Sequence, residues 1–391
     1  MRRLQNPRRS YDWGSLLAIP RFLGEPISAD SVAEIWMGTH PIAPSRVDDD
    51  STLRELVGDL PFMLKILAAD RPLSLQVHPD AKLAEVGYAE EERAGVPLDA
   101  PHRVFKDPRP KPEMVLALTT FDTLVGFRPT AEILRILGAL PTDLTRSLAE
   151  QLRARPGFAG IVALVERLVT DPPAAEQVAE VVRWCIVGLD QRLDVKRAYQ
   201  TAVEVNEHHR GDVGVIVSLL LNRLTLQPGE AAYLATGIIH AHLRGMCLEV
   251  MVSSDNVLRA GLTSKHLDPQ GLIRCLSEGM SKVARVEPVQ FGESTDLFVP
   301  GLREFALAMT QVSAAETDGV VLPDEGRRIL VCTGGEVELV NDDGERVLLH
   351  RGDAVFADAG DGTIRAVGTG EVAQAYTPTA ADRATPLVPL V

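Results

Sequence analysis

The length, composition and charge of the chain exclude several classes of protein. Its 391 residues are 45% hydrophobic and 24% charged, the balance of a folded protein of two or three domains and not of a disordered chain. The formal net charge of −14 argues against nucleic acid or an anionic membrane as a general partner. An anionic small substrate would therefore need a local cluster of Arg and Lys.

The sequence shows no sign of a membrane span, a secretory signal or a disulfide framework. The apolar run at 215–221 is among the richest in the chain, and it is far shorter than the ~20 residues that cross a bilayer. The basic segment at 1–9 is followed by no apolar stretch, and the four cysteines are scattered without a C-x-x-C motif. We therefore expect a cytoplasmic protein with reduced thiols.

The first region of the chain, up to Pro129, has the pattern of strands. Short apolar runs alternate with Gly, Pro and Asp, which end strands. Strands are expected at 62–67, 73–78 and 114–118.

The second region, 130–205, has a helical pattern. Leu134, Leu137 and Leu140 recur at helical spacing, and Thr142 follows a proline as a candidate N-cap. The stretch at 174–188, rich in Ala, Glu and Val, extends this pattern. We expect a helical insertion here.

Strand patterns return after Gly214 and continue to the C-terminus. We expect strands at 215–220, 231–235, 247–252, 328–331, 336–340, 346–349, 353–357 and 363–367. Residues 341–344, Asn-Asp-Asp-Gly, predict a hairpin turn. Evenly spaced short strands are typical of a sandwich or small barrel. The segment at 227–233 resembles 350–356, which suggests two related β-barrels.

Three short segments carry groups that bind metal ions. Gln76 and His78 share one face of a strand, Glu113 opens an apolar strand, and His240 and His242 form an H-x-H motif. Each segment alone is also typical of a strand end. Together Gln76, His78, Glu113 and His240 offer two imidazole nitrogens and two oxygens, a set that suits zinc with an open coordination position.

A fourth segment, 249–265, mixes acidic and basic groups. Glu249 is a candidate general base, and Arg259 and Lys265 supply the positive charge that a sugar-phosphate site needs. The segment alone is equally typical of a loop with ordinary surface charges.

Taken in order, these segments resemble the type I mannose-6-phosphate isomerases, also called phosphomannose isomerases. The matching stretches are 11–15, 33–41, 72–80, 111–114, 126–129, 240–241, Glu249 and 254–263. The tail at 330–376 resembles the C-terminal cupin barrel of that family and carries no metal motif.

The resemblance implies an architecture. It implies a mainly β fold with a helical insertion, built from two cupin-type β-barrels (jelly rolls) and an α-helical subdomain. The expected catalytic cupin domain is discontinuous, 1–129 and 206–285, with the insertion at 130–205 and a cupin-like barrel at 286–391.

The resemblance also implies a reaction. It implies a zinc-dependent aldose–ketose isomerase that interconverts D-mannose 6-phosphate and D-fructose 6-phosphate by proton transfer through a cis-enediol(ate). It places one zinc ion per chain on Gln76, His78, Glu113 and His240. The other site residues implied are Arg259, Glu249 and Lys111 for catalysis and Ser74, Asp255 and Lys265 for substrate binding. We expect a monomer whose partner is a small sugar phosphate, without nucleic acid or membrane.

Two positions depart from the family pattern. Arg109 and Pro110 precede Lys111 where the family often reads Asn-His, and His242 replaces the tyrosine of H-A-Y. A histidine at 242 could hydrogen-bond like the tyrosine or compete for the metal. We expect that it is not a ligand, because the zinc set is complete with His240.

Two rival functions stay open at this point. A cupin oxygenase would use Fe(II), with His240 and His242 as two of its ligands, and would depend on iron and oxygen. A non-catalytic sugar-phosphate-binding cupin would keep the fold without turnover. The complete set of ligands and Arg259 argues against the second rival.

Overall fold

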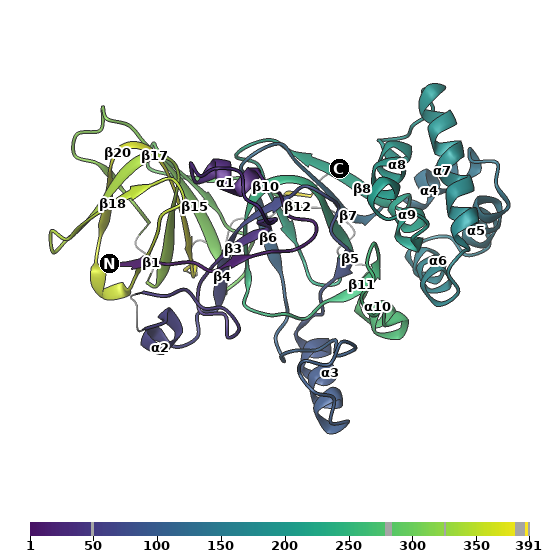
Figure 1. Cartoon of the computed structure of the whole chain (residues 1–391), viewed down its shortest axis with the longest axis horizontal. Helices are drawn as coiled ribbons and strands as arrows, with labels where there is room; N and C mark the ends of the chain where they lie inside the picture. The colour runs from purple at the N-terminus through teal and green to yellow at the C-terminus, as the bar shows by residue number, and fades with distance from the viewer. Residues whose placement is uncertain (48–50, 278–283, 324–325, 380–387, 390–391) are drawn as a thin grey trace.

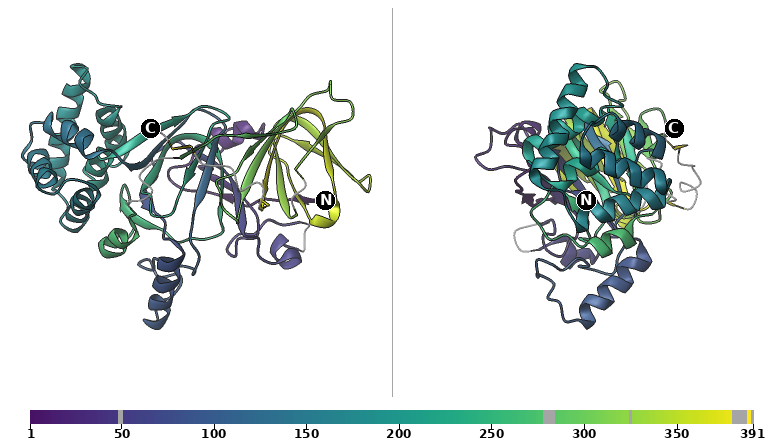
Figure 2. Two further views of the ribbon diagram at one scale, coloured as in Figure 1. Left: turned by 180° about the vertical axis from the view of Figure 1, so that it is seen from behind. Right: turned by 90° about the vertical axis from the view of Figure 1, so that its right-hand side faces the viewer.

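The computed structural model describes residues 1–47, 51–277, 284–323, 326–379 and 388–389. Three parts lie side by side along its longest axis: a sheet formed mostly by the C-terminal region, a central sheet and a group of helices (Figure 1). The view from behind shows the helices and the C-terminal sheet at opposite ends of the molecule (Figure 2). The prediction of a mainly β fold with a helical insertion is confirmed.

The central sheet holds the predicted site. Within the described residues its main path runs β2 (Arg8–Arg9), β3 (Glu34–Met37), β4 (Phe62–Ala69), β10 (His240–Val252), β6 (Glu113–Ala117), β9 (Ala231–Leu234), β12 (Ala284–Val286) and β21 (Val388–Pro389). Off this path lie β5 (Leu75–Val77), β7 (Phe121–Phe127), β8 (Leu221–Leu226) and β11 (Leu258–Gly261).

Strand β10 connects the two halves of this central sheet. Its second half pairs with β4 and β6, whereas its first residues pair with β5 and β7, all antiparallel. Every residue of β4 is buried, as expected for a strand covered on both faces. Lys65 and Glu249 are the charged residues of β4 and of the second half of β10, and they face each other in register.

The second sheet contains both early and late parts of the chain. Its described strands are, in spatial order, β1 (Arg2–Leu4), β19 (Ala354–Ala357), β17 (Arg328–Asn341), β20 (Ile364–Tyr376), β15 (Ala306–Val312), β14 (Thr295–Phe298) and β13 (Val289–Phe291). Beside them, β16 (Val320–Val321) pairs with β20, and β18 (Arg346–His350) pairs with β17. One apolar cluster contains Phe62 of β4 and Ile329 and Phe356 of this sheet, so the two sheets share a core.

The hairpin predicted at 341–344 is confirmed. The Gly344 N–H donates to the Asn341 carbonyl at 3.0 Å, and Gly344 has the positive φ of 78° that such a turn requires. The strands predicted at 328–331 and 336–340 form one strand, β17, whose pairing shifts register between Cys332 and Gly334.

The helical part supports the strands of the predicted site. Its helices are α4 (Thr130–Gly138), α5 (Asp143–Ala154), α6 (Phe158–Thr170), α7 (Ala175–Asp190), α8 (Ala198–His208) and α9 (Val213–Ser218). Thr142 caps α5 as predicted, its hydroxyl accepting from the Thr145 N–H at 3.1 Å. The buried faces of these helices pack in one cluster with Leu75, Val77 and Leu258.

The strand predicted at 215–220 is wrong, because most of this run forms helix α9. Asp212 caps the helix by accepting from the Gly214 N–H at 2.6 Å. All residues of α9 are buried, and a short run that is apolar apart from Ser218 has too little periodicity to separate a buried helix from a buried strand.

The remaining described helices lie outside this group. They are α1 (Ala18–Phe22), α2 (Leu53–Val57), α3 (Ala81–Arg93), α10 (Pro269–Cys275) and the 3₁₀ turn η1 (Ala359–Asp361). Helix α3, which the strand pattern of the first region did not indicate, projects from the central part (Figure 1). None of the helices in the described ranges is long and apolar enough to span a membrane. The division into domains stays a prediction, and residues 48–50, 278–283, 324–325, 380–387 and 390–391 of it lie outside the described residues.

Candidate active site

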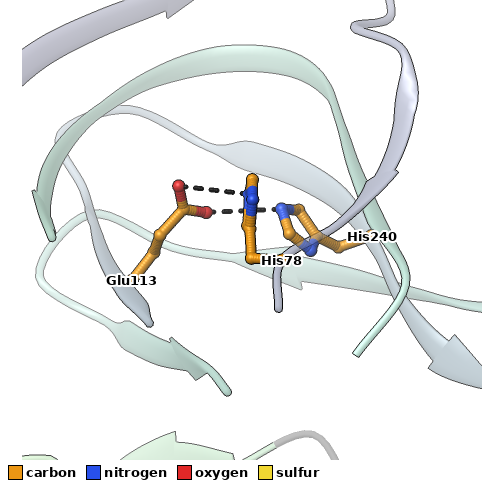
Figure 3. A group of neighbouring side chains, drawn as sticks. All are labelled: His78, Glu113 and His240. Atoms are coloured by element: carbon orange, nitrogen blue, oxygen red, sulfur yellow. Dashed lines mark ion pairs between the residues drawn. The ribbon is translucent and has the colours of Figure 1, made fainter. Parts of the chain in front are cut away.

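Strands β5, β6 and β10 bring the predicted metal ligands together. Gln76 of β5 lies opposite His240, the first residue of β10, while Glu113 opens β6 and His78 directly follows β5. One ligand atom from each of His78, Glu113 and His240 lies within 4.8 Å of the others. Figure 3 shows the carboxylate of Glu113 facing both imidazole rings.

The distances within this group are short and its members are buried. The Nε2 atoms of His78 and His240 lie 3.4 and 3.3 Å from the two carboxylate oxygens of Glu113. The side-chain amide of Gln76 lies 3.3 Å from His240 Nε2, and a half-turn of the amide places its oxygen there. The fourth predicted ligand therefore lies beside the group formed by the other three.

The protonation of the group fits a metal ion. His78 Nδ1 donates to the Asn256 carbonyl at 2.6 Å and His240 Nδ1 to the Ile238 carbonyl at 3.0 Å, so each Nε2 presents a lone pair to the centre. His78 Nε2 and Glu113 Oε2 are buried without a hydrogen-bond partner, and a metal ion would satisfy both atoms.

The pKa values point the same way. Burial, together with the positive charge of Lys111, lowers the pKa of His78 to about 4. Burial would raise the pKa of Glu113, but the ammonium of Lys111, 3.1 Å away, holds it well below its usual range. Both groups are therefore deprotonated near neutral pH, the form in which they bind metal ions.

A cavity of about 610 Å³ opens beside this group. The predicted site residues that line it are Ser74, Gln76, Lys111, Glu113, Glu249, Asp255, Arg259 and Lys265. The other two, His78 and His240, are buried next to Glu113. The volume lies in the range of small-molecule sites, about 300–1,000 Å³.

One side of the cavity is cationic. Burial lowers the pKa of Arg259, and Arg259 Nε has no hydrogen-bond partner. Partial burial of its ammonium group also lowers the pKa of Lys265, and the positive charge of Arg259 adds to this effect. Arg71 lines the same cavity. An anion bound here would relieve the repulsion between these cations.

Another part of the cavity wall is a buried ion-pair network. Lys65 Nζ lies 2.9 Å from Glu249 Oε2 and 3.5 Å from Glu34 Oε1, and Trp36 Nε1 donates to Glu34 at 2.7 Å. Burial would raise the pKa of Glu249, but Lys65 lowers it to about 2. Glu249 is therefore a carboxylate at neutral pH. The sequence interpretation did not identify Lys65 or Glu34 as residues of the site. The one signal for Lys65 was the presence of a lysine inside the apolar run at 62–67.

His242 contacts this network and lies outside the metal group. Its Nε2 is 3.4 Å from Glu249 Oε1, and its Nδ1 is 3.1 Å from the Thr123 hydroxyl. The group of possible metal ligands in the described residues contains His78, Glu113 and His240. The oxygenase alternative, which needs His240 and His242 as ligands, is therefore not favoured.

Of the remaining positions named from the sequence, Asp255 lies in the wall of the cavity, whereas Arg109 and Pro110 lie outside it. Asp255 Oδ2 lies 3.3 Å from His40 Nε2; burial would raise the pKa of Asp255, but His40 lowers it. Arg109 turns away to Asp59, 3.1 Å from its guanidinium, and lines a separate, smaller cavity with Pro110. The Arg-Pro departure thus leaves the metal group and the cation side in place.

Comparison with known proteins supports one family. The model of the phosphomannose isomerase type I catalytic domain matches residues 1–59 and 53–130. The mannose-6-phosphate isomerase of Salmonella typhimurium is 33% identical over 96% of this chain and 99% of its own length. The human mannose-6-phosphate isomerase is 30% identical over 84% of this chain and 86% of its own length.

The chain belongs to the type I phosphomannose isomerase family. The crystal structure of the Salmonella typhimurium enzyme bound to substrate (f6p) and zinc has a TM-score of 0.86 against this chain, with 31% identity. It covers 97% of this chain, and the match includes 100% of that chain. A holo, zinc-bound crystal structure of mannose 6-phosphate isomerase matches with the same TM-score over 99% of its length.

Proposed function

We propose that this member of the family is a zinc-dependent aldose–ketose isomerase that interconverts D-mannose 6-phosphate and D-fructose 6-phosphate. The observation that carries the proposal is one cavity that joins the buried His78–Glu113–His240 group to the cations Arg259 and Lys265. A sugar phosphate needs both features, a metal site for its reacting oxygens and positive charge for its phosphate. The related structure with zinc and f6p supports the same pairing.

Gln76, His78, Glu113 and His240 are the residues proposed to hold the zinc ion. Bound zinc supplies positive charge that polarises sugar oxygens and favours the negative charge of an enediolate. The backbone carbonyls of Asn256 and Ile238 keep the two imidazoles in the tautomer that this role requires.

The cation side is proposed to bind and orient the phosphate. Lys265 supplies charge, and the hydroxyl of Ser74, which lines the same cavity, supplies a hydrogen bond. Arg259 stabilises negative charge that develops on the sugar. Asp255, held by His40, is proposed to bind a sugar hydroxyl.

Proton transfer between C2 and C1 of the open-chain sugar is proposed for Glu249 and Lys111. Removal of the C2 proton of the aldose leaves a cis-enediolate, and return of a proton to C1 with transfer of the O2 proton to O1 gives the ketose. Glu249 is in its basic form and Lys65 and His242 fix its two oxygens. Lys111 Nζ lies 3.1 Å from Glu113, where it can give or take a proton beside the metal group.

The test is the rate of conversion of mannose 6-phosphate into fructose 6-phosphate by chelator-stripped protein, before and after zinc is restored. We expect activity to vanish with the metal and return with it. A folded, zinc-loaded protein without turnover would contradict the proposal. Oxygen uptake with iron would then favour the oxygenase, and binding of mannose 6-phosphate without turnover would favour the non-catalytic cupin.

The finer expectations on architecture, assembly and compartment are also proposals. We propose that the two sheets are cupin-type jelly rolls, that the chain acts as a monomer and that it works in the cytoplasm. The four unpaired, buried cysteines support a reducing compartment. Light scattering of the purified protein would test the monomer.

A further inference from the structure

One buried side chain, Asn256, holds the loop that leads into the metal group. Its Oδ1 accepts from the backbone N–H groups of Lys106 and Asp107 at 2.7 and 3.2 Å. Its Nδ2 donates to the carbonyls of Asp107 and Arg109 at 2.7 and 2.9 Å. Asn256 is 0% exposed, and both polar atoms of its side chain are used on this loop.

The loop needs such support because its own backbone offers few hydrogen bonds. No helix or strand is formed between α3 and β6. Prolines at 108, 110 and 112 alternate with Arg109 and Lys111, and a proline has no N–H to donate. The position of Lys111 is therefore determined by contacts from outside the loop. The hydrogen bond from Asn256 to the Arg109 carbonyl is one of them, two residues before Lys111.

The backbone of Asn256 reaches the other side of the same site. Its carbonyl accepts from Nδ1 of His78 at 2.6 Å. The N–H of its neighbour Asp255 donates to Asp107 Oδ2 at 3.0 Å. One residue thus connects the loop that carries Lys111, the ligand His78 and the cavity-lining Asp255.

We propose that Asn256 is a positioning residue for turnover: its side chain sets Lys111 against the metal group by holding the 106–110 loop. The inference rests on the proposed function for its kinetic consequence. The phosphate-facing groups Arg259 and Lys265 lie on a different segment from this loop, so binding of the phosphate does not depend on it. A displacement of about 1 Å in a reacting group costs about 100-fold in rate.

The test compares Asn256→Ala and Asn256→Asp with Asn341→Ala. Asn341 is the matched control because it is also buried and holds a turn, accepting from the Glu345 N–H at 2.8 Å, but lies in the second sheet. For Asn256→Ala we expect kcat to fall about 10- to 100-fold, with KM and zinc content close to native values. The Lys106 and Asp107 amides should exchange hydrogen faster than in the native chain.

Asn256→Asp separates the accepting role of the side-chain oxygen from the donating role of the side-chain nitrogen. Its carboxylate still accepts from the amides of Lys106 and Asp107, so their slow exchange should persist. It cannot donate to the Arg109 carbonyl, so kcat should fall as in the alanine variant. If Asn256→Ala does not fold, the aspartate variant carries the test.

Native kcat in a folded, zinc-loaded Asn256 variant would overturn the proposal, as would an equal loss of kcat in Asn341→Ala. Unchanged exchange of the two amides in Asn256→Ala would overturn the proposed hold on the loop. Absence of isomerase activity in the native chain would instead refute the proposed function, and the exchange measurement would still decide the hold on the loop.

Discussion

Lys65 and Glu249 face each other across the strands β4 and β10, with 2.9 Å between the ammonium nitrogen and the nearer carboxylate oxygen. Both side chains are buried, and Glu34 lies 3.5 Å from the same nitrogen. Burial would lower the pKa of Lys65, but the two carboxylates raise it above its usual value. The lysine therefore stays charged in the cavity wall and keeps Glu249 ionised.

Lys65→Met should destabilise the protein and lower its isomerase rate. The substitution leaves Glu249 and Glu34 buried without their cation, and breaking a buried ion pair in this way costs about 3–5 kcal/mol. Urea unfolding measures the stability, and the isomerase rate reports the loss of an ionised Glu249. Adding Glu249→Gln should recover part of the stability but no activity. A single variant as stable as the native chain would contradict the assigned network.

The sequence indicated the members of the His78–Glu113–His240 group better than the residues around them. His78, Glu113 and His240 stand in short motifs of chemically suitable residues. Nothing local indicates that β5 pairs with β10, since Gln76 and His240 are 164 residues apart. That pairing depends on long-range packing, which the resemblance to a family supplied and periodicity did not.

The groups that hold the site in place were harder to predict. Lys65 lies in an apolar strand and has meaning only once Glu249 faces it. In the sequence, Asn256 has the pattern of an ordinary turn residue. The residues that it contacts, 106–109, belong to a distant segment of the chain. The strand predicted at 215–220 was wrong for a different reason: the run is apolar apart from Ser218, so its pattern alone did not separate a helix from a strand.

His242→Tyr should keep the zinc site intact. His242 contacts Glu249 and Thr123 and lies outside the metal group, and a tyrosine hydroxyl can replace one of these hydrogen bonds. We expect one zinc ion per chain and a change in kcat/KM of less than about tenfold, the worth of one hydrogen bond. Elemental analysis after gel filtration checks the metal. Loss of zinc from a folded variant would show that His242 is a ligand.

Asp122→Asn should change the acid stability of the protein at a distance from the cavity. Burial would raise the pKa of Asp122, but the guanidinium of Arg223, 2.6 Å away, lowers it below its ordinary value of 3.8. A carboxyl whose pKa is lower in the folded state stabilises the protein above pH 3.8, and this contribution disappears as the pH falls through the folded-state pKa.

The free energy of unfolding, measured from pH 7 down to pH 3, tests this sign. The asparagine variant should be about 2 kcal/mol less stable at pH 7, and the difference should shrink below pH 4. A difference that is constant over the whole range would show that the ionisation of Asp122 does not stabilise the fold. Asp143→Asn, at an exposed position, is the control and should match the native chain.

On the cation side of the cavity, substitution of Arg259 should weaken substrate binding more than substitution of Lys265. Lys265 is exposed, so its charge is screened by water, and Lys265→Ala should raise KM for mannose 6-phosphate only about fivefold. Arg259 is more buried and has an unpartnered Nε. Arg259→Ala should therefore raise KM by a larger factor and also lower kcat. Inorganic phosphate, used as a competitive inhibitor, should bind both variants more weakly. Because neither side chain belongs to the metal group, both variants should retain zinc. Equal inhibition of the native chain and the two variants by phosphate would place the phosphate elsewhere in the cavity.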